Sequence, residues 1–163
     1  MIVISDTSSI SNLAAIGQLL LLKCLYSVVI IPDAVYKELA LSPFLSSNKT
    51  LDSYNWVQVR SVGDRTLVDD LLTELDTGEA EAIALATEMK AELLLLDEAD
   101  ARRVAKREGL KRTGVLGVLT EAKAQGLITE IRPLILALRD QADFWLSKSL
   151  CNEVLRSVGE NLM

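Results

Sequence analysis

Short, uninterrupted apolar runs constrain the fold of this chain more than any other feature. Three of them occupy residues 1–4, 28–31 and 93–96. Uninterrupted apolar runs of this length suit strands that are covered on both faces in a parallel sheet. Segments with helical periodicity separate the runs. This alternation predicts an α/β fold, a three-layer α/β/α sandwich around a central, mainly parallel sheet.

The length and composition fit one domain of this class. The chain has 163 residues, of which half are hydrophobic and few are aromatic. Such a composition suits aliphatic helices packed on a parallel sheet better than a β-sandwich. We therefore expect a single domain spanning residues 1–163, with an amphipathic helical tail at 143–163 docked on it.

Residue types that are rare or absent exclude several kinds of chemistry. The chain has no histidine, and Cys24 and Cys151 stand alone, so zinc sites built from Cys or His and mechanisms that need an imidazole base are excluded. The net charge of −6 gives no general attraction for a polyanion, which would have to meet a local basic patch or bound cations. The sequence resembles neither a signal peptide nor a membrane span, so we expect a cytoplasmic protein without a membrane partner.

Four acidic residues recur at comparable places in this pattern. Asp6 and Asp97 follow the first and third apolar runs. Glu38 lies in a helix predicted at 33–40, and Glu79 begins a helix of small residues. Because parallel strands end at the same edge of a sheet, these side chains can converge there. Two carboxylates about 4 Å apart repel by about 4 kcal/mol at an effective dielectric constant near 20, so an all-oxygen cluster indicates a hard cation, Mg²⁺ or Mn²⁺.

Local roles at helix ends are the alternative for these acids. Asp6 could cap the helix that follows it, and Asp76 with Glu79 has the spacing of a capping box. Glu38 could be a solvated helix residue. Ser8 lies in the first turn after Asp6, where a helix N-terminus favours anions, and is a candidate to orient a phosphate or a water molecule.

The region around Asp97 is dense in charge. Glu98 and Asp100 follow it, which favours a functional role for Asp97 over helix capping and makes Asp100 a weaker additional ligand. Basic residues then repeat at helical spacing and continue into the next strand: Arg102, Arg103, Lys106, Arg107, Lys111 and Arg112. Arg102 and Arg103 are candidates for phosphate contact, and a solvated helix face paired with neighbouring acids is the alternative.

The order and spacing of these segments resemble a known family. The segments are DTS at 6–8, PDAVYKEL at 32–39, GEAEAIALA at 78–86, LLDEADAR at 95–102, TGVLGVL at 113–119 and FWLS at 144–147. They resemble the successive motifs of a PIN domain, and most closely those of the VapC-like prokaryotic group known as DUF3368. The resemblance covers nearly the whole chain and implies a PIN-like fold.

The resemblance also implies a function. It implies a ribonuclease that depends on Mg²⁺ or Mn²⁺, with acidic site positions at Asp6, Glu38, Glu79 and Asp97. It further implies the toxin half of a toxin–antitoxin pair, with RNA as substrate, a cognate antitoxin protein as partner and a homodimeric state. Many relatives have Asp where Glu79 stands, and the fourth ligand could be Asp97, Glu98 or Asp100. The alternative is a non-catalytic PIN-like module that binds nucleic acid or protein.

Overall fold

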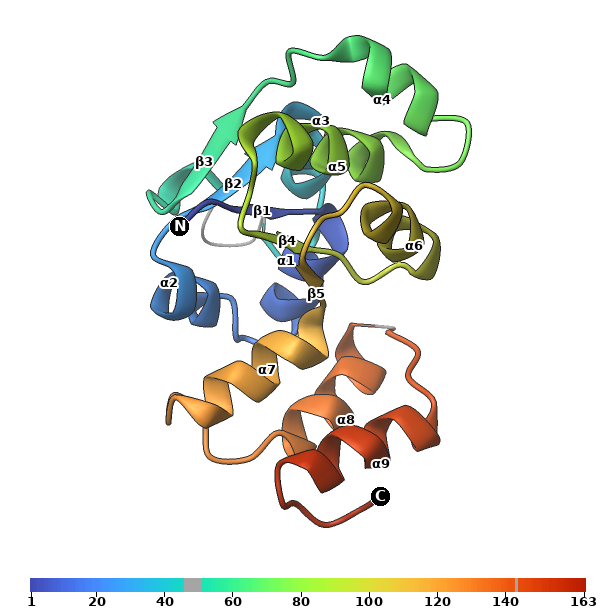
Figure 1. Ribbon diagram of the computed structural model, residues 1–163. Coiled ribbons are helices and arrows are strands. Elements are labelled where there is room, and N and C mark those ends of the chain that lie inside the picture. The colour runs from blue at the N-terminus through green and yellow to red at the C-terminus, as the bar shows by residue number, and fades with distance from the viewer. Residues whose placement is uncertain (46–50, 143) are drawn as a thin grey trace.

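A parallel sheet forms the centre of the molecule (Figure 1). The computed structural model describes residues 1–45, 51–142 and 144–163. Its strands are β1 (Val3–Ser5), β2 (Val29–Pro32), β3 (Val57–Arg60), β4 (Leu93–Leu95) and β5 (Arg112–Thr113). They lie in the order β3-β2-β1-β4-β5, and each neighbouring pair is parallel. β1 is therefore the central strand, with β2 and β3 on one side of it and β4 and β5 on the other.

Helices cover both faces of this sheet. In the described residues they are α1 (Thr7–Ala15), α2 (Leu20–Tyr26), α3 (Asp33–Ala40), α4 (Arg65–Leu71), α5 (Thr77–Met89), α6 (Ala99–Arg107), α7 (Val115–Ala124), α8 (Arg132–Gln141) and α9 (Lys148–Ser157), with a 3-10 turn η1 (Leu51–Ser53). Figure 1 shows α4, α5 and α6 on one side of the sheet and α2 and α7 on the other, with α8 and α9 stacked beyond α7. The predicted α/β sandwich with a parallel sheet is confirmed.

The apolar runs are buried because both faces of their strands are covered. Successive residues of a strand point to opposite faces. Val3 and Leu95 belong to an apolar cluster shared with α1, α2, α3, α7, α8 and α9. Ile4 and Leu94 belong to a second cluster, shared with α4, α5 and α6. All four side chains are fully buried, so the sheet separates two cores and supports both.

The C-terminal segment extends the first of these clusters. Leu146, Cys151 and Leu155 are buried in the same cluster as Val3. Residue 143, the first of the predicted tail, lies outside the described residues. Over the ranges that the structure describes, none of the helices has both the length and the apolar surface needed to cross a membrane.

Candidate active site

The candidate site lies where the sheet order changes direction. β1 pairs with β2 on one side and with β4 on the other. Ser5 lies opposite Leu95 across the β1–β4 pair, and the backbone N–H of Asp6 donates to the carbonyl of Leu95 at 3.0 Å. In open α/β sheets ligands bind outside the carboxyl ends of the strands at such a point. Asp6 and Asp97 therefore leave neighbouring strands at a place suited to a ligand.

Asp6 is a buried acid of which only one oxygen is satisfied. The residue is 2% exposed and is the N-cap of α1, where its Oδ1 accepts a 2.9 Å hydrogen bond from the backbone N–H of Ser9. The capping alternative is thus confirmed for Asp6. Its Oδ2 is also buried, and among the described residues it has no hydrogen-bond partner. Burying a carboxylate oxygen without a hydrogen-bond partner costs free energy. A cation bound to Oδ2 would offset that cost and would therefore bind strongly.

Asp97 is held between two helix N-termini. Its Oδ1 accepts from the backbone N–H of Val115, the first residue of α7, at 2.9 Å. Its Oδ2 accepts from the hydroxyl of buried Ser9 at 3.0 Å, so Ser9 binds Asp6 through its N–H and Asp97 through its hydroxyl. A Cβ at Gly114 would lie 2.5 Å from Oδ1 of Asp97. The carboxylate can therefore occupy this place only because residue 114 has no side chain.

Burial raises the pKa of both acids. The pKa of Asp6 rises from 3.8 to about 7, chiefly because burial disfavours the charged form, and the charge of Asp97 raises it further. Burial likewise raises the pKa of Asp97, although the hydrogen bonds from Val115 and Ser9 and the charge of Arg102 oppose this. An opposite charge close to two such carboxylates would favour their ionised forms.

Glu38 approaches the same edge of the sheet from α3. Its Oε2 accepts a 2.5 Å hydrogen bond from the hydroxyl of Thr7, the first residue of α1. Its Oε1 lies against the start of α5, since a Cβ at Gly78 would stand 2.8 Å from it. The carboxylate of Glu38 therefore lies next to the N-termini of both α1 and α5, directly beside the residue that follows Asp6.

Glu79 is both a capping residue and a neighbour of the other acids. Oδ1 of Asp76 accepts from the N–H of Glu79 at 2.8 Å, and Oε2 of Glu79 accepts from the N–H of Asp76 at 3.4 Å, which confirms the capping box. The pKa of Glu79 is nevertheless raised, first by burial and then by the charges of Asp76, Glu98 and Glu38. The last two contributions place Glu79 in the electrostatic field of the site.

Comparisons with known proteins identify the family. A family model, DUF3368, described as a PIN domain, matches residues 2–160. The chain belongs to the PIN domain family. A PilT N-terminus domain protein, SSO1118, from the hyperthermophilic archaeon Sulfolobus solfataricus P2 has a similar structure, with a TM-score of 0.53 and 23% sequence identity over 75% of this chain and 93% of that one. That likeness supports the fold alone. A comparison with curated proteins finds no match.

Two hydroxyl residues of α1 support the acids of this PIN domain, and the sequence reasoning missed both. Ser9 joins Asp6 to Asp97, and Thr7 binds Glu38. The hydrogen bond from Ser9 to Asp6 could have been predicted, because the residue three positions after an N-cap donates its N–H to the cap. Ser8, which was predicted to touch substrate, is half-buried, and its side chain has no hydrogen-bond partner within the described residues.

Arg102 is the basic residue of α6 that faces the site. It is exposed, and with Asp97 and Glu98 it lines a cavity of about 690 Å³. Its charge lowers the pKa of Asp97. A guanidinium in this place is able to bind a phosphate beside the acids.

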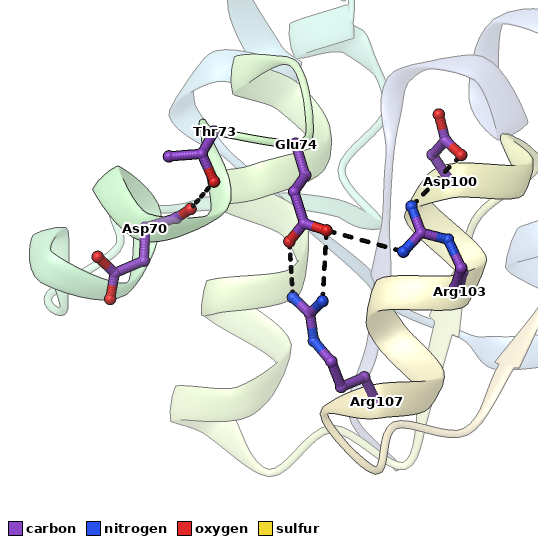
Figure 2. A network of polar contacts seen from close by, with 6 residues as sticks. All are labelled: Asp70, Thr73, Glu74, Asp100, Arg103 and Arg107. Atoms are coloured by element: carbon purple, nitrogen blue, oxygen red, sulfur yellow. Dashed lines mark hydrogen bonds and ion pairs between the residues drawn. The ribbon is translucent and has the colours of Figure 1, made fainter.

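Arg103, also predicted to touch substrate, lies in a different environment. Figure 2 shows Arg103 and Arg107 converging on Glu74, with Asp100 beside Arg103. Arg107 binds Glu74 through two hydrogen bonds of 3.3 and 2.8 Å, and Arg103 lies 3.7 Å from Glu74 and 3.5 Å from Asp100. Asp100, predicted as an additional ligand, therefore pairs with its own helix. The network links the loop before α5 to α6.

Glu81 has a similar positioning role on the other side of α5. It is 5% exposed, accepts from the backbone N–H of Ala34 at 3.0 Å and forms a 3.0 Å ion pair with Arg65. These contacts attach the start of α3, which carries Glu38, to α5, which carries Glu79.

The donor set fits a hard divalent cation, although it is not drawn together into a cage. Within the described ranges, no three acidic or cysteine side chains lie close enough to hold one ion. The candidate donors are all carboxylate oxygens, the type that Mg²⁺ and Mn²⁺ prefer. PIN domains usually use divalent metal ions. Oδ2 of Asp6 is the atom that supports this fit most directly, because it is buried and has no other partner in the described chain.

Proposed function

We propose that this PIN domain is a Mg²⁺- or Mn²⁺-dependent ribonuclease that hydrolyses phosphodiester bonds in RNA. PIN domains are typically nucleases, which supports the general class of reaction. The observation that carries the proposal is the buried Oδ2 of Asp6, which has no hydrogen-bond partner in the part of the chain that the structure describes and lies near Asp97 at the turning point of the sheet. A carboxylate that is costly to bury indicates a role in binding or catalysis.

The four acids take different parts in this proposal. Asp6 and Asp97 hold the ion, and Glu38 and Glu79 complete the ligand set. When bound, such an ion lowers the pKa of an attacking water and neutralises charge on the phosphate. Because the chain has no histidine, the lowered pKa of that water or a nearby carboxylate would take the place of an imidazole base.

Two residues position the substrate in this scheme. Arg102 binds a phosphate from the cavity that it shares with Asp97. Ser8 orients a phosphate oxygen at the N-terminus of α1, where free backbone N–H groups favour anions. Arg103 contributes less, since Glu74 and Asp100 already bind its guanidinium.

Cleavage of RNA with and without Mg²⁺ or Mn²⁺ tests the proposal. We expect the wild-type protein to need the metal and both Asp6→Asn and Asp97→Asn to be inactive. Asp64→Asn is the matched control, because Asp64 caps α4 as Asp6 caps α1, accepting from the N–H of Leu67 at 3.1 Å. Full activity in either of the first two variants would contradict the assignment.

A second candidate, a non-catalytic interaction module, has specific support. Asp6 and Glu79 both stabilise helix N-termini, so these acids have a structural role without any metal. Titration with Mn²⁺ separates the two candidates, because a ligand that binds only the folded state raises its thermal stability. No binding and no change in unfolding temperature would favour the module.

We also propose, on the family resemblance, that the ribonuclease is a cytoplasmic toxin that acts as a homodimer and pairs with an antitoxin. Inducing the protein in bacterial cells tests this role. We expect growth to stop, and we expect Asp6→Asn to restore it. Normal growth of cells that contain an active wild-type nuclease would contradict the toxin role and leave the proposed chemistry intact.

A further inference from the structure

The cavity beside Asp97 has an apolar wall that the proposed chemistry does not use. One side of the cavity is formed by Asp97, Glu98 and Arg102. The other side comes from the C-terminal segment, with Phe144, Trp145, Leu146, Leu150 and Val154. Figure 1 shows residues 144–147, which lead into α9, at the right of the view and below α6. The candidate active site therefore continues directly onto an apolar surface formed by residues far away in sequence.

Trp145 is the most prominent side chain of this wall. It is 83% exposed, whereas Leu146 next to it is 8% exposed and belongs to the apolar core. The indole is thus displayed from an anchored backbone. Trp145 also lines a second, smaller cavity of about 150 Å³ together with Arg139 and Phe144. It therefore stands between two hollows, one of which reaches Asp97.

An arginine lies in each hollow beside Trp145. Arg102 lines the larger cavity and Arg139 the smaller one, and both are exposed. Neither takes part in an ion pair with another residue of the described chain. An exposed aromatic ring flanked by cationic side chains is the arrangement by which proteins bind single-stranded nucleic acid, with bases stacked on the ring and phosphates on the cations. The smaller cavity holds Arg139 and no acidic residue, whereas the larger one holds Arg102 together with Asp97 and Glu98, the acids proposed to face a cation. The cationic side chains on both sides of Trp145 are therefore placed to meet phosphates that flank a stacked base.

We propose that Trp145 stacks on an unpaired base of single-stranded RNA next to the bond that is cleaved, while Arg102 and Arg139 contact the flanking phosphates. This inference rests on the proposed ribonuclease function and deepens it by assigning Trp145 and Arg139, outside the acidic site, to binding of the RNA strand. A base in a duplex is already stacked and paired, so it offers no free face on which the indole of Trp145 could stack. Stacking is tolerant of sequence, so Trp145 selects strandedness more than base identity.

Binding of a short fluorescein-labelled RNA, measured by anisotropy in EDTA so that no cleavage occurs, tests the inference. We expect Trp145→Ala to weaken binding about ten-fold or more, and Trp145→Phe to retain most of the affinity. Leu41→Ala is the matched control, because Leu41 is 86% exposed and lies outside both cavities. We expect it to bind as the wild type does. Unchanged affinity in Trp145→Ala, or no binding by the wild type, would overturn the inference.

Tryptophan fluorescence gives a second readout on the same samples. The chain has two tryptophans, of which Trp56 is 5% exposed and Trp145 is 83% exposed. Stacking on a base should therefore quench mainly Trp145, and the quenching should disappear in Trp145→Ala. Quenching of equal size in that variant would overturn the inference.

Two further measurements separate other occupants of the surface. A duplex of the same sequence should bind more weakly than the single strand, and equal affinity would overturn stacking. Sedimentation of the wild type and Trp145→Ala should give the same mass, and loss of a dimer in the variant would make the surface an interface between copies and overturn the inference. RNA binding through Trp145 without metal-dependent cleavage would instead refute the ribonuclease proposal alone.

Discussion

The two pairs of acids at the end of the sheet are held in opposite ways. Asp6 and Asp97 follow central strands, are bound by backbone N–H groups and share Ser9. Glu38 is exposed and Glu79 half-buried, and both project from helices. A short, buried side chain has its place fixed by the sheet, while a longer one on a helix can adjust. The comparison suggests that the first pair sets the position of a cation and the second adapts to it.

The largest difference between the pairs should appear in cleavage. We expect Asp6→Asn and Asp97→Asn to lower kcat/KM for RNA by about 100-fold or more, the usual scale for loss of a preorganised electrostatic group. Glu38→Gln and Glu79→Gln should each lower kcat/KM by only about 10-fold, a ten-fold smaller loss, because the remaining flexible carboxylate can compensate. Equal losses in all four variants, measured at saturating Mn²⁺, would remove the distinction between the pairs.

A change at Gly114 tests whether Asp97 needs its fixed place. In Gly114→Ala the new Cβ would stand 2.5 Å from Oδ1 of Asp97, so the carboxylate must move. A displacement of about 1 Å at a reacting centre can cost about 100-fold in rate, and we expect a loss of between about 10-fold and 100-fold. In the control Gly63→Ala the contact, also 2.5 Å, is with the flexible end of Glu88. Wild-type rates in Gly114→Ala would show that Asp97 is as adaptable as Glu38.

The burial of Asp6 predicts a stability difference that depends on pH in metal-free protein. Because the folded-state pKa, about 7, lies above the ordinary 3.8, the stability linked to protonated Asp6 is fully present below about pH 4 and is lost as the pH rises through about 7. Asp6→Asn cannot ionise and keeps an oxygen for the N–H of Ser9. It should therefore exceed the wild type in unfolding free energy by about 2–4 kcal/mol at about pH 8.

Urea unfolding across this pH range measures the effect. The difference should shrink towards zero at about pH 4, where Asp6 is protonated in both folded and unfolded chains. The exposed cap variant Asp64→Asn should show no such trend. A variant less stable than the wild type at about pH 8 would mean that Asp6 is retained for stability, as in the module alternative.

The smallest effect should come from the ion-pair network of Figure 2. Glu74→Gln removes the acceptor of Arg103 and Arg107, but these side chains are largely exposed, and exposed ion pairs stabilise proteins weakly. We expect a small drop in unfolding temperature that vanishes at about 1 M salt, where charges are screened. Glu153→Gln is the control, because Glu153 is also exposed and lies outside the network. A drop that is unaffected by salt would contradict a role through charge.

The sequence predicted which strand ends and helix starts carry the acids, because these features follow from local sequence patterns. Apolar runs ended at Asp6 and Asp97, and the spacing of Asp76 and Glu79 matched the capping box that the structure contains. The capping role of Glu79 was thus predictable from the sequence. The apolar pattern sets which residues are buried, and the parallel arrangement sets which ends of the strands meet.

Local sequence patterns did not predict the contacts between segments that are far apart in the sequence. The hydrogen bond from Ser9 to Asp97 spans 88 positions, and the approach of Gly114 to Asp97 depends on how α7 begins. Helical spacing placed Arg103 and Arg107 on one surface, but it did not show that Glu74, from a different segment, would meet them there. Residues far apart in sequence are brought together by packing, which a local pattern does not contain.

A crystal of the protein soaked in Mn²⁺ and measured for anomalous scattering tests the central claim most directly. The account predicts a manganese peak within about 2.0–2.6 Å, the usual range for hard cations, of Oδ2 of Asp6, with Asp97 in the same coordination sphere. Ordered manganese elsewhere on the molecule, with Oδ2 of Asp6 still unbound, would contradict it.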